Sequence, residues 1–111
     1  MSKKVLMVAS LFFVCLLTAG ESAGSGAVVA WGDNSENQCY VPSPNTDFIA
    51  VAGGVVHSLG LRGDGSVVAW GSNAHHQCDV PSPNTGFIAI AAGGWHSLGL
   101  KENGSVVAWG T

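Results

Sequence analysis

The chain has 111 residues, of which 47% are hydrophobic and only 10% are charged, and its formal net charge is −3. This length allows one domain at most, and the apolar composition excludes a disordered chain. Sixteen glycines and four prolines favour many turns over long helices.

The first twenty residues are typical of a secretory signal peptide. Lys3 and Lys4 precede an apolar run over residues 5–19. As a helix this run would span roughly 22 Å, less than the bilayer core of about 30 Å. Small residues follow it, so we predict cleavage after Gly20. The alternative is an uncleaved membrane anchor. We expect residues 1–20 to be the signal peptide, 21–25 a linker, and the mature chain to be secreted, periplasmic or at the cell surface, without a membrane segment.

Removal of the signal peptide would make the chain more acidic. Only Arg62 and Lys101 would remain against seven acidic side chains, a net charge of −5. A basic patch for phosphate groups is therefore absent from the expected mature sequence, which argues against nucleic-acid binding.

The rest of the chain is a repeat. The heptapeptide GSVVAWG occurs at residues 65–71 and 104–110, and GAVVAWG occurs at 26–32. Aligning the chain with itself at an offset of 39 gives 25 identities between residues 26–64 and 65–103 without a gap. This indicates a repeat architecture over 26–110, with unit one at 26–64, unit two at 65–103 and the start of unit three at 104–110.

Each unit reads as short antiparallel strands joined by tight turns. The turn pairs Asp64-Gly65 and Asn103-Gly104 are strong hairpin signals. Prolines end a weaker outer strand in each unit. The expected strands lie near 27–31, 48–52, 57–61, 66–70, 87–91, 96–100 and 105–109, with outer strands near 38–41 and 77–80.

Both faces of these strands are apolar. Val67 and Ala69 would lie on one face, and Val68 and Trp70 on the other. A sheet with one wet face would alternate apolar and polar residues, so these small sheets must be covered on both sides. Stacking around an axis achieves this, which predicts an all-β partial β-propeller of about two four-stranded antiparallel blades. Glycines within strands, Gly60 and Gly99, would allow close approach between blades.

The motifs VVAWG, N-x-x-x-Q, VP, F-I-A-V/I-A and H-S-L-G-L resemble the short bacterial repeats of the regulator-of-chromosome-condensation superfamily, including the second β-lactamase inhibitor protein. The resemblance covers residues 26–110. It implies a seven-bladed propeller that binds proteins through loops at its faces. Seven units would need far more residues than the 85 present here. The nuclear activity of eukaryotic members on a small GTPase and chromatin is not implied for an exported, acidic chain, and no loop motif carries over the inhibitory activity.

Several residues recur once per unit, which favours structural roles. His57 and His96 are expected to be hydrogen-bonding pegs between blades, because a catalytic residue would occur once with its partners. The other structural repeat positions are Trp31, Trp70, Trp109, Gln38 and Gln77. In the His75-His76-x-Cys78 cluster only the cysteine recurs, and its spacing matches no standard zinc site. We therefore expect no metal and no cofactor.

Three further motifs have structural explanations. The integrin-type tripeptide at 62–64 becomes Lys-Glu-Asn in unit two, so it reads as a turn. The glycosylation sequon at 103–105 coincides with a hairpin turn. Cys39 and Cys78 occupy equivalent positions on neighbouring blades, too far apart for a bridge, and are expected to be small apolar fillers beside Val41 and Val80.

No nucleophile with a matching base, phosphate loop or distinctive carboxylate pair indicates catalysis. The sequence thus favours a non-catalytic module that binds an unknown protein. An inhibitor of a secreted enzyme and a glycan-binding or adhesive module are the alternatives. The non-repeated residues Trp95, Tyr40, His75 and His76 are the candidate binding residues. The unfinished third unit indicates a fragment of a longer propeller. If the chain is complete, we expect self-association through its uncovered blade faces.

Overall fold

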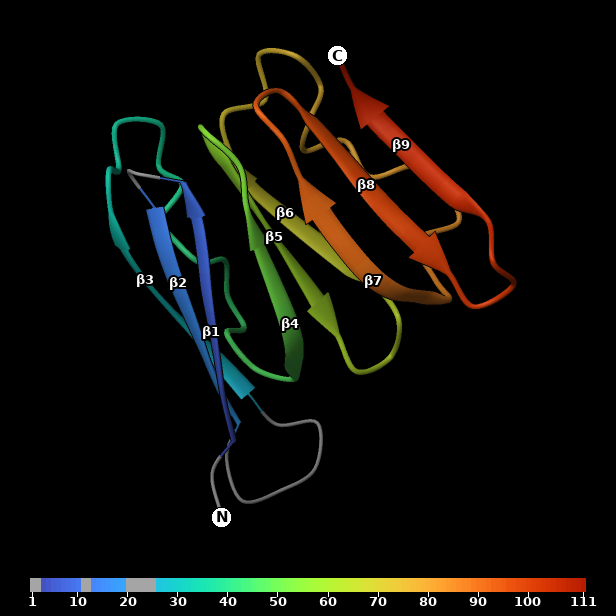
Figure 1. The fold of residues 1–111 in the computed structure, drawn as a ribbon, viewed down its shortest axis with the longest axis horizontal. Coiled ribbons are helices and arrows are strands. Elements are labelled where there is room, and N and C mark those ends of the chain that lie inside the picture. The colour runs from blue at the N-terminus through green and yellow to red at the C-terminus, as the bar shows by residue number, and fades with distance from the viewer. Residues whose placement is uncertain (1–2, 11–12, 20–25) are drawn as a thin grey trace.

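The computed structural model describes residues 3–10, 13–19 and 26–111, and side chains from residue 26 onward. All regular secondary structure in this part is β-strand, which confirms the all-β prediction (Figure 1). The strands are β1 (Lys3–Ser10), β2 (Phe13–Ala19), β3 (Gly26–Gly32), β4 (Phe48–Gly53), β5 (His57–Arg62), β6 (Val67–Gly71), β7 (Phe87–Ala92), β8 (His96–Lys101) and β9 (Val106–Gly110).

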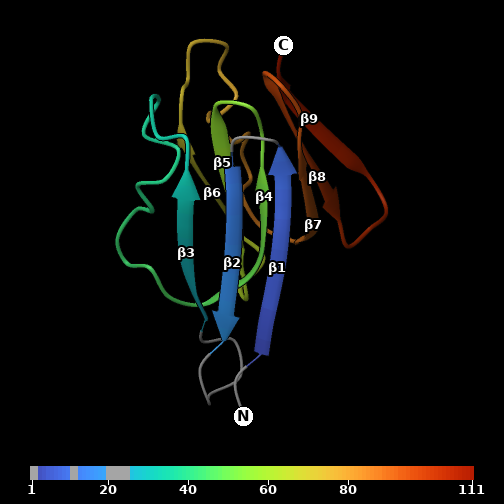
Figure 2. The same cartoon turned by 60° about the vertical axis from the view of Figure 1, so that its left-hand side comes forward.

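The strands form three antiparallel three-stranded sheets, here called sheet A (β1-β2-β3), sheet B (β4-β5-β6) and sheet C (β7-β8-β9). Figure 2 shows them standing side by side, as blades of a partial β-propeller do. The seven inner strands predicted over the repeat are confirmed to within about two residues at each end. The described part of the chain holds no helix with the length and apolarity to cross a bilayer.

Sheet A is built partly from the segment predicted to be a signal peptide. Strand β2 pairs with β3 so that Phe13 lies opposite Gly32, whereas in sheet B His57 lies opposite Gly71. Phe13 and His57 occupy equivalent places in their sheets but are 44 positions apart in the sequence, whereas the repeat offset is 39. The segment therefore stands in the place of inner blade strands without being a copy of them. Its cleavage stays a prediction.

The predicted outer strands near 38–41 and 77–80 are wrong, because these residues form turns and irregular chain. Side chains satisfy the backbone there. The Asn45 amide accepts from Val28 N at 2.7 Å and donates to Val28 O at 2.8 Å. Asn84 makes the same two bonds to Val67, both at 2.8 Å. One asparagine per unit thus replaces a fourth strand beside β3 and β6.

Two apolar layers separate the three sheets. Val28, Phe48, Val51 and Trp70 fill the layer between sheets A and B. The layer between sheets B and C holds Ala52, Leu59, Leu61, Val67, Phe87 and Trp109. Neighbouring residues of one strand, such as Val67 and Val68, join different layers, so the prediction that both sheet faces are covered is confirmed for sheet B.

The glycines within strands have a different neighbour from the one predicted. A Cβ on Gly60 would collide with the ring of Phe48, and one on Gly99 with the ring of Phe87. In each case the ring belongs to the adjacent strand of the same sheet. The close approach is therefore between an aromatic ring and a strand within one blade, not between blades.

Candidate interaction surface

The blades are tied together by main-chain carbonyl groups of the repeated glutamines. Gln38 O accepts from Trp70 Nε1 at 2.8 Å and from Ser58 Oγ at 2.9 Å. Gln77 O accepts from Trp109 Nε1 and Ser97 Oγ at 2.8 and 2.9 Å. Each glutamine belongs to the segment before the blade that it holds, and both glutamines are buried. These positions therefore serve the framework.

The two repeated histidines differ in surroundings. His57 is fully buried, and its Nε2 lies 2.9 Å from Ser97 Oγ on the next blade. Because that hydroxyl proton goes to Gln77 O, the ring donates through Nε2. Burial, and secondarily the charge of His96, lower the pKa of His57 below its usual value. His96 itself is exposed.

The exposed loop at 72–79 is held by hydrogen bonds between its own residues. Asn73 Oδ1 accepts from Cys78 N at 2.8 Å, and Gln77 Oε1 accepts from His75 N at 2.8 Å. Unit one repeats this frame, with Asn34 accepting from Cys39 N and Gln38 from Glu36 N. The frame is shared, so residues 74–76 can change without altering the fold.

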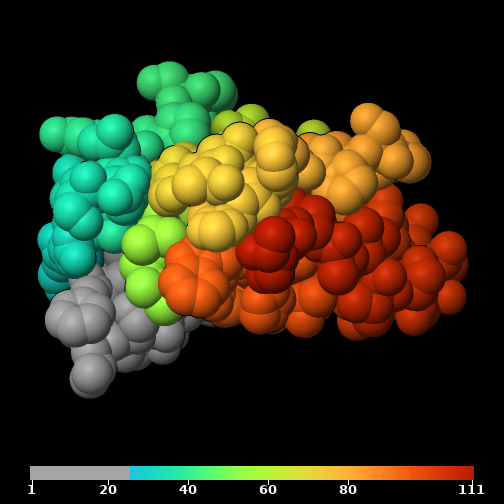
Figure 3. Space-filling view, turned by 90° about the horizontal axis from the view of Figure 1, so that it is seen from above, coloured from blue at the N-terminus to red at the C-terminus, as the bar shows by residue number. Residues whose placement is uncertain are grey.

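Two candidate residues come together on this frame. The rings of His75 and Trp95 lie 5.6 Å apart between centroids, at 47°. Trp95 is 55% exposed, and Val55 on the preceding blade is 46% exposed. Val55 lies 4.0 Å from the place of a Cβ on Gly94, beside Trp95. We call Val55, His75 and Trp95 the Trp95 patch. In Figure 3 the segment around residues 72–80 (yellow) lies against the neighbouring blade connections (green and orange).

His76 lies on the same loop but pairs locally. Its Nδ1 is 2.8 Å from Asp79 Oδ2, and Asn73 Nδ2 donates to Asp79 Oδ1 at 2.9 Å. The hydrogen bond from His76, followed by that from Asn73, lowers the pKa of Asp79. His76 also has a φ of 61°, as Asn37 does at the equivalent position with 62°. The pair orders the tip of the loop.

Tyr40 is 67% exposed on the corresponding segment of unit one. Among the described side chains, no aromatic contact joins it to the Trp95 patch. The structure thus brings together two of the four candidate binding residues, His75 and Trp95. It adds Val55, which sequence reasoning missed because this residue is small, apolar and without a motif.

The remaining motifs serve turns. The Arg62 guanidinium donates to Pro44 O at 2.9 Å and lies 5.0 Å from the Phe48 ring centroid. Asp64 accepts from Ser66 N and Oγ at 2.9 and 2.6 Å, and these bonds lower its pKa. Asn103 accepts from Ser105 N and Oγ at 2.9 and 2.7 Å in the same way. Both motifs cap hairpins.

Cys39 and Cys78 are free, as predicted. Each thiol donates to a main-chain oxygen, that of Asp33 at 3.4 Å and that of Ser72 at 3.3 Å. Burial raises both thiol pKa values, that of Cys78 to about 11. Such thiols are poor nucleophiles and poor metal ligands. Among the described side chains, no group of three His, Cys, Asp or Glu residues is arranged to hold a metal ion.

Sequence reasoning also missed Asn45 and Asn84, whose amides replace the fourth strand. The signal was present, because PSPNT occurs unchanged at 42–46 and 81–85. Its prolines were read only as strand ends, whereas the asparagine three residues after the first proline makes two bonds to the preceding strand of its own unit.

The repeat geometry agrees with a known family. The profile of the regulator of chromosome condensation (RCC1) repeat matches residues 48–77 and 87–111. The chain belongs to the RCC1-repeat proteins. No curated protein sequence matches the chain detectably.

Solved propeller structures resemble it over nearly its whole length. Prp20p of Saccharomyces cerevisiae, studied for its binding to Gsp1p and histones, has a TM-score of 0.69 at 25% identity, over 86% of this chain and 28% of its own. Human WBSCR16 has a TM-score of 0.76 at 21% identity, over 99% of this chain and 34% of its own. The ectodomain of the Arabidopsis thaliana receptor kinase ACR4 has a TM-score of 0.72 at 20% identity, over 99% of this chain and 40% of its own. This RCC1-repeat chain therefore spans well under half the length of these structures.

Proposed function

We propose that this chain is an exported, non-catalytic RCC1-repeat module that binds another protein through the Trp95 patch. The observation that carries the proposal is a comparison between units. At the positions of Glu36 and Val56 in unit one, unit two has His75 and Trp95. The loop hydrogen bonds beneath them are the same in both units. The two units therefore share the same loop frame and differ in the side chains exposed on it, His75 and Trp95 in unit two.

The patch has the properties of a protein-binding anchor. A half-exposed tryptophan on an ordered loop can be buried by a partner at a low cost in side-chain entropy, and tryptophan is enriched among residues that dominate binding energy. The solved RCC1-type structure of yeast includes a complex with Kap60. Protein binding is thus known for one protein with this repeat.

A non-catalytic role agrees with the titratable groups. The Cys78 thiol has a raised pKa, and the Asp79 carboxylate is held by two hydrogen bonds. His57 is buried between blades, where a substrate has no access. These groups stabilise the fold and offer no activated nucleophile beside a base.

The test exchanges the patch for its counterpart in unit one. His75→Glu and Trp95→Val, singly and together, keep the loop frame and remove the aromatic pair. Immobilised wild-type protein should retain a protein from the medium or periplasm of its host, and the double variant should bind that protein at least about tenfold more weakly. Tyr40→Asp, the matching exchange in unit one, is the control and should bind normally. Equal retention by wild type and double variant would refute the role of the patch.

Export has a separate test. The N-terminal sequence of protein recovered outside the cytoplasm should begin at Glu21. A chain that retains Met1 and remains in the cytoplasm would contradict export, and would leave the binding measurement unaffected.

The two alternative functions can be separated with the same variants. A glycan array in which wild-type binding disappears with Trp95→Val would favour stacking of a sugar on the indole ring over a protein partner. If the captured protein is a secreted enzyme, its activity with and without the chain distinguishes an inhibitor from a passive binding module.

A further inference from the structure

The repeat has two ends that carry different side chains. Strands β6 and β9 stop at one of them, here called the loop end, where Ser72 N donates to Val56 O at 2.9 Å and Thr111 N donates to Trp95 O at 3.0 Å. The Trp95 patch therefore belongs to the loop end. The β5–β6 and β8–β9 hairpins form the opposite end, here called the hairpin end, toward the bottom of Figure 1.

The loop end is acidic. It carries three exposed carboxylates, those of Asp33 and Glu36 after β3 and that of Asp79 after β6. The main-chain bonds of Gln38 and Gln77 to the next blade anchor both segments at this end. Hydrogen bonds from residues of their own loops lower the pKa of Asp33 and of Asp79, so both are ionised at neutral pH.

The described basic side chains lie at the hairpin end and are already engaged. Each donates to main-chain carbonyl oxygens and lies over an aromatic ring, Arg62 at 5.0 Å from the Phe48 centroid and Lys101 at 4.1 Å from that of Phe87. The main chain at Lys3 is at the same end, where β1 begins. None of the described lysine or arginine side chains can therefore neutralise the carboxylates of the loop end.

Trp95 places an aromatic ring at this acidic end, which Figure 3 shows from above. Its side chain is 55% exposed, and the ring of His75 lies 5.6 Å away. The equivalent residue of unit one, Val56, is only half-buried although unit two follows it, and its neighbour Val55 is 46% exposed. The position is thus partly open in a unit that has neighbours on both sides, and tryptophan is a larger side chain than valine.

We infer that the partner of the Trp95 patch presents a basic segment, with an arginine side chain packed on the Trp95 ring and the carboxylates of the loop end attracting it. Both units already hold a cation over an aromatic ring, and tryptophan binds cations better than phenylalanine does. A planar guanidinium also stacks on an indole, which favours arginine over lysine. Asp79, on the same loop as His75, supplies the opposite charge. This inference rests on the proposed function and adds the chemistry of the partner.

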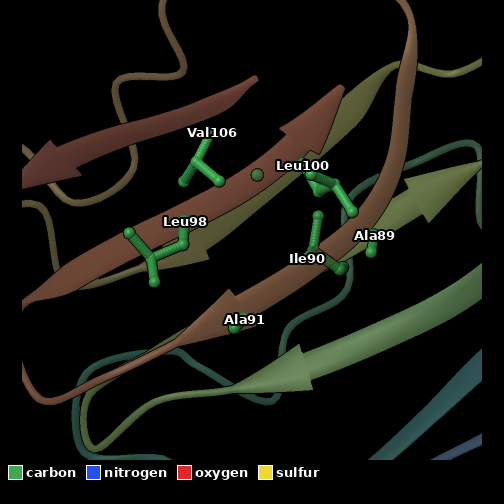
Figure 4. A pocket seen from close by; sticks show the side chains of 7 residues that line it. Ala89, Ile90, Ala91, Leu98, Leu100 and Val106 are labelled. Atoms are coloured by element: carbon green, nitrogen blue, oxygen red, sulfur yellow. The ribbon is translucent and has the colours of Figure 1, made fainter. Parts of the chain in front are cut away.

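An apolar pocket on sheet C has the opposite character. Figure 4 shows its lining, which includes Ala89, Ile90, Leu98, Leu100 and Val106. No charged or aromatic side chain lines this pocket, so it gives a cation no reason to bind. Val106→Gln, at an exposed side chain of the pocket, therefore serves as a control variant.

Two peptides that differ only in charge test the inference on the full chain. The probe is a short polyarginine peptide, and its citrulline counterpart keeps the shape of the side chains without the charge. Isothermal titration at low salt should show binding of the arginine peptide, with the citrulline peptide at least about tenfold weaker. Trp95→Val should weaken the arginine peptide about tenfold, and Asp79→Asn about threefold. Far-UV circular dichroism checks that every variant is folded.

Asp64→Asn is the matched charge control at the hairpin end. Unit two has Asn103 at the equivalent position with the same two bonds to a serine, so the turn tolerates the change. Binding of the arginine peptide should be unchanged in Asp64→Asn and in Val106→Gln. Equal binding of the two peptides, or equal weakening by Asp64→Asn and Asp79→Asn, would overturn the inference. If the captured protein still depends on Trp95 but the arginine peptide does not bind, the basic partner is overturned and the proposed function stands.

Discussion

Leu59 and Leu98 lie in strands with the same five-letter sequence, HSLGL, yet one is fully buried and the other is partly exposed. The difference does not come from the strands, because both pair with their neighbours in the same register. It comes from sheet C, which covers this face of sheet B, whereas no described residue covers the equivalent face of sheet C. In this fold each unit obtains its core from the unit that follows. Identical residues therefore contribute differently to stability.

The largest expected difference in stability is between Leu→Ala substitutions at the two equivalent leucines. Leu59→Ala should lower the free energy of unfolding by about 2–5 kcal/mol, because it leaves a cavity in a closed layer. Leu98→Ala should lower it by only about 1 kcal/mol, since that side chain is half-buried. Urea unfolding followed by circular dichroism measures both, and equal losses would contradict the comparison.

The cysteines sharpen the comparison between units one and two. In a Cys15→Ser background, Cys78 should react with iodoacetamide at pH 8 roughly a hundredfold more slowly than the unfolded chain does, because its pKa of about 11 leaves little thiolate. Cys39, whose thiol is less deeply buried, should react faster than Cys78. Mass spectrometry of digested protein gives both rates. Similar rates in the native and urea-unfolded chains would argue against the buried thiol.

The three repeated tryptophans, Trp31, Trp70 and Trp109, should differ in their contribution to stability. Trp70→Phe and Trp109→Phe should each cost about 1–2 kcal/mol, because each removes a buried hydrogen bond to a glutamine carbonyl group. Trp31→Phe, at an exposed copy of the position, should cost less than about 0.5 kcal/mol. Thermal unfolding at low protein concentration ranks the three, and a large loss at Trp31 would be inconsistent with its exposure.

His57 should make the stability of the protein depend on pH. The folded pKa of His57 lies below its unfolded value of about 6.5, so its contribution is complete above pH 6.5 and is lost as pH falls below it. The slope should be at most about 1.4 kcal/mol per pH unit. His57→Gln should flatten the stability profile between pH 7 and 5. His96→Gln, at an exposed site, should keep most of the slope, and a slope that survives His57→Gln would assign it elsewhere.

The smallest effect concerns backbone conformation. Asp47 has a φ of 65°, where unit two has Gly86 with a φ of 74°. Glycine adopts this region without strain, so Asp47→Gly should raise stability by roughly 0.5 kcal/mol. Gly86→Asp should lower it by a similar amount. Chemical denaturation resolves both, and destabilisation by Asp47→Gly would show that the aspartate makes a compensating contact.

Most of the fold can be predicted from the sequence, because residues 26–64 and 65–103 repeat the same pattern and each unit supports the strand assignment of the other. Alternating apolar residues placed the inner strands, and the absence of a polar face required covered sheets. The outer strand could not be placed the same way. Whether residues 38–41 pair as a strand depends on competition from the side chains of Gln38 and Asn45. The Asn45 bonds to Val28 form only after the chain turns back.

Part of the candidate site could also be predicted by comparing the two units. Trp95 and His75 stood out because the repeat does not require them, yet their contact spans twenty residues and arises only when loop and blade connection meet. Val55 has no distinguishing chemistry in the sequence. Its place beside Gly94 is set by the stacking of sheets B and C.

The ties from Gln38 and Gln77 to the next blade have a consequence for engineering. Because the accepting atom is a main-chain carbonyl oxygen and the donor is a tryptophan of the next blade, the tie does not require particular side chains at 35–37 or 74–76. Natural variation already uses this freedom, since SEN at 35–37 and AHH at 74–76 occupy equivalent frames. A combinatorial library randomised at residues 35, 36, 74 and 75 should therefore remain largely folded, with Asn37 and His76 kept because both have a positive φ. This makes the unit a modular display scaffold, in which recognition loops can be selected independently of the blades that hold them.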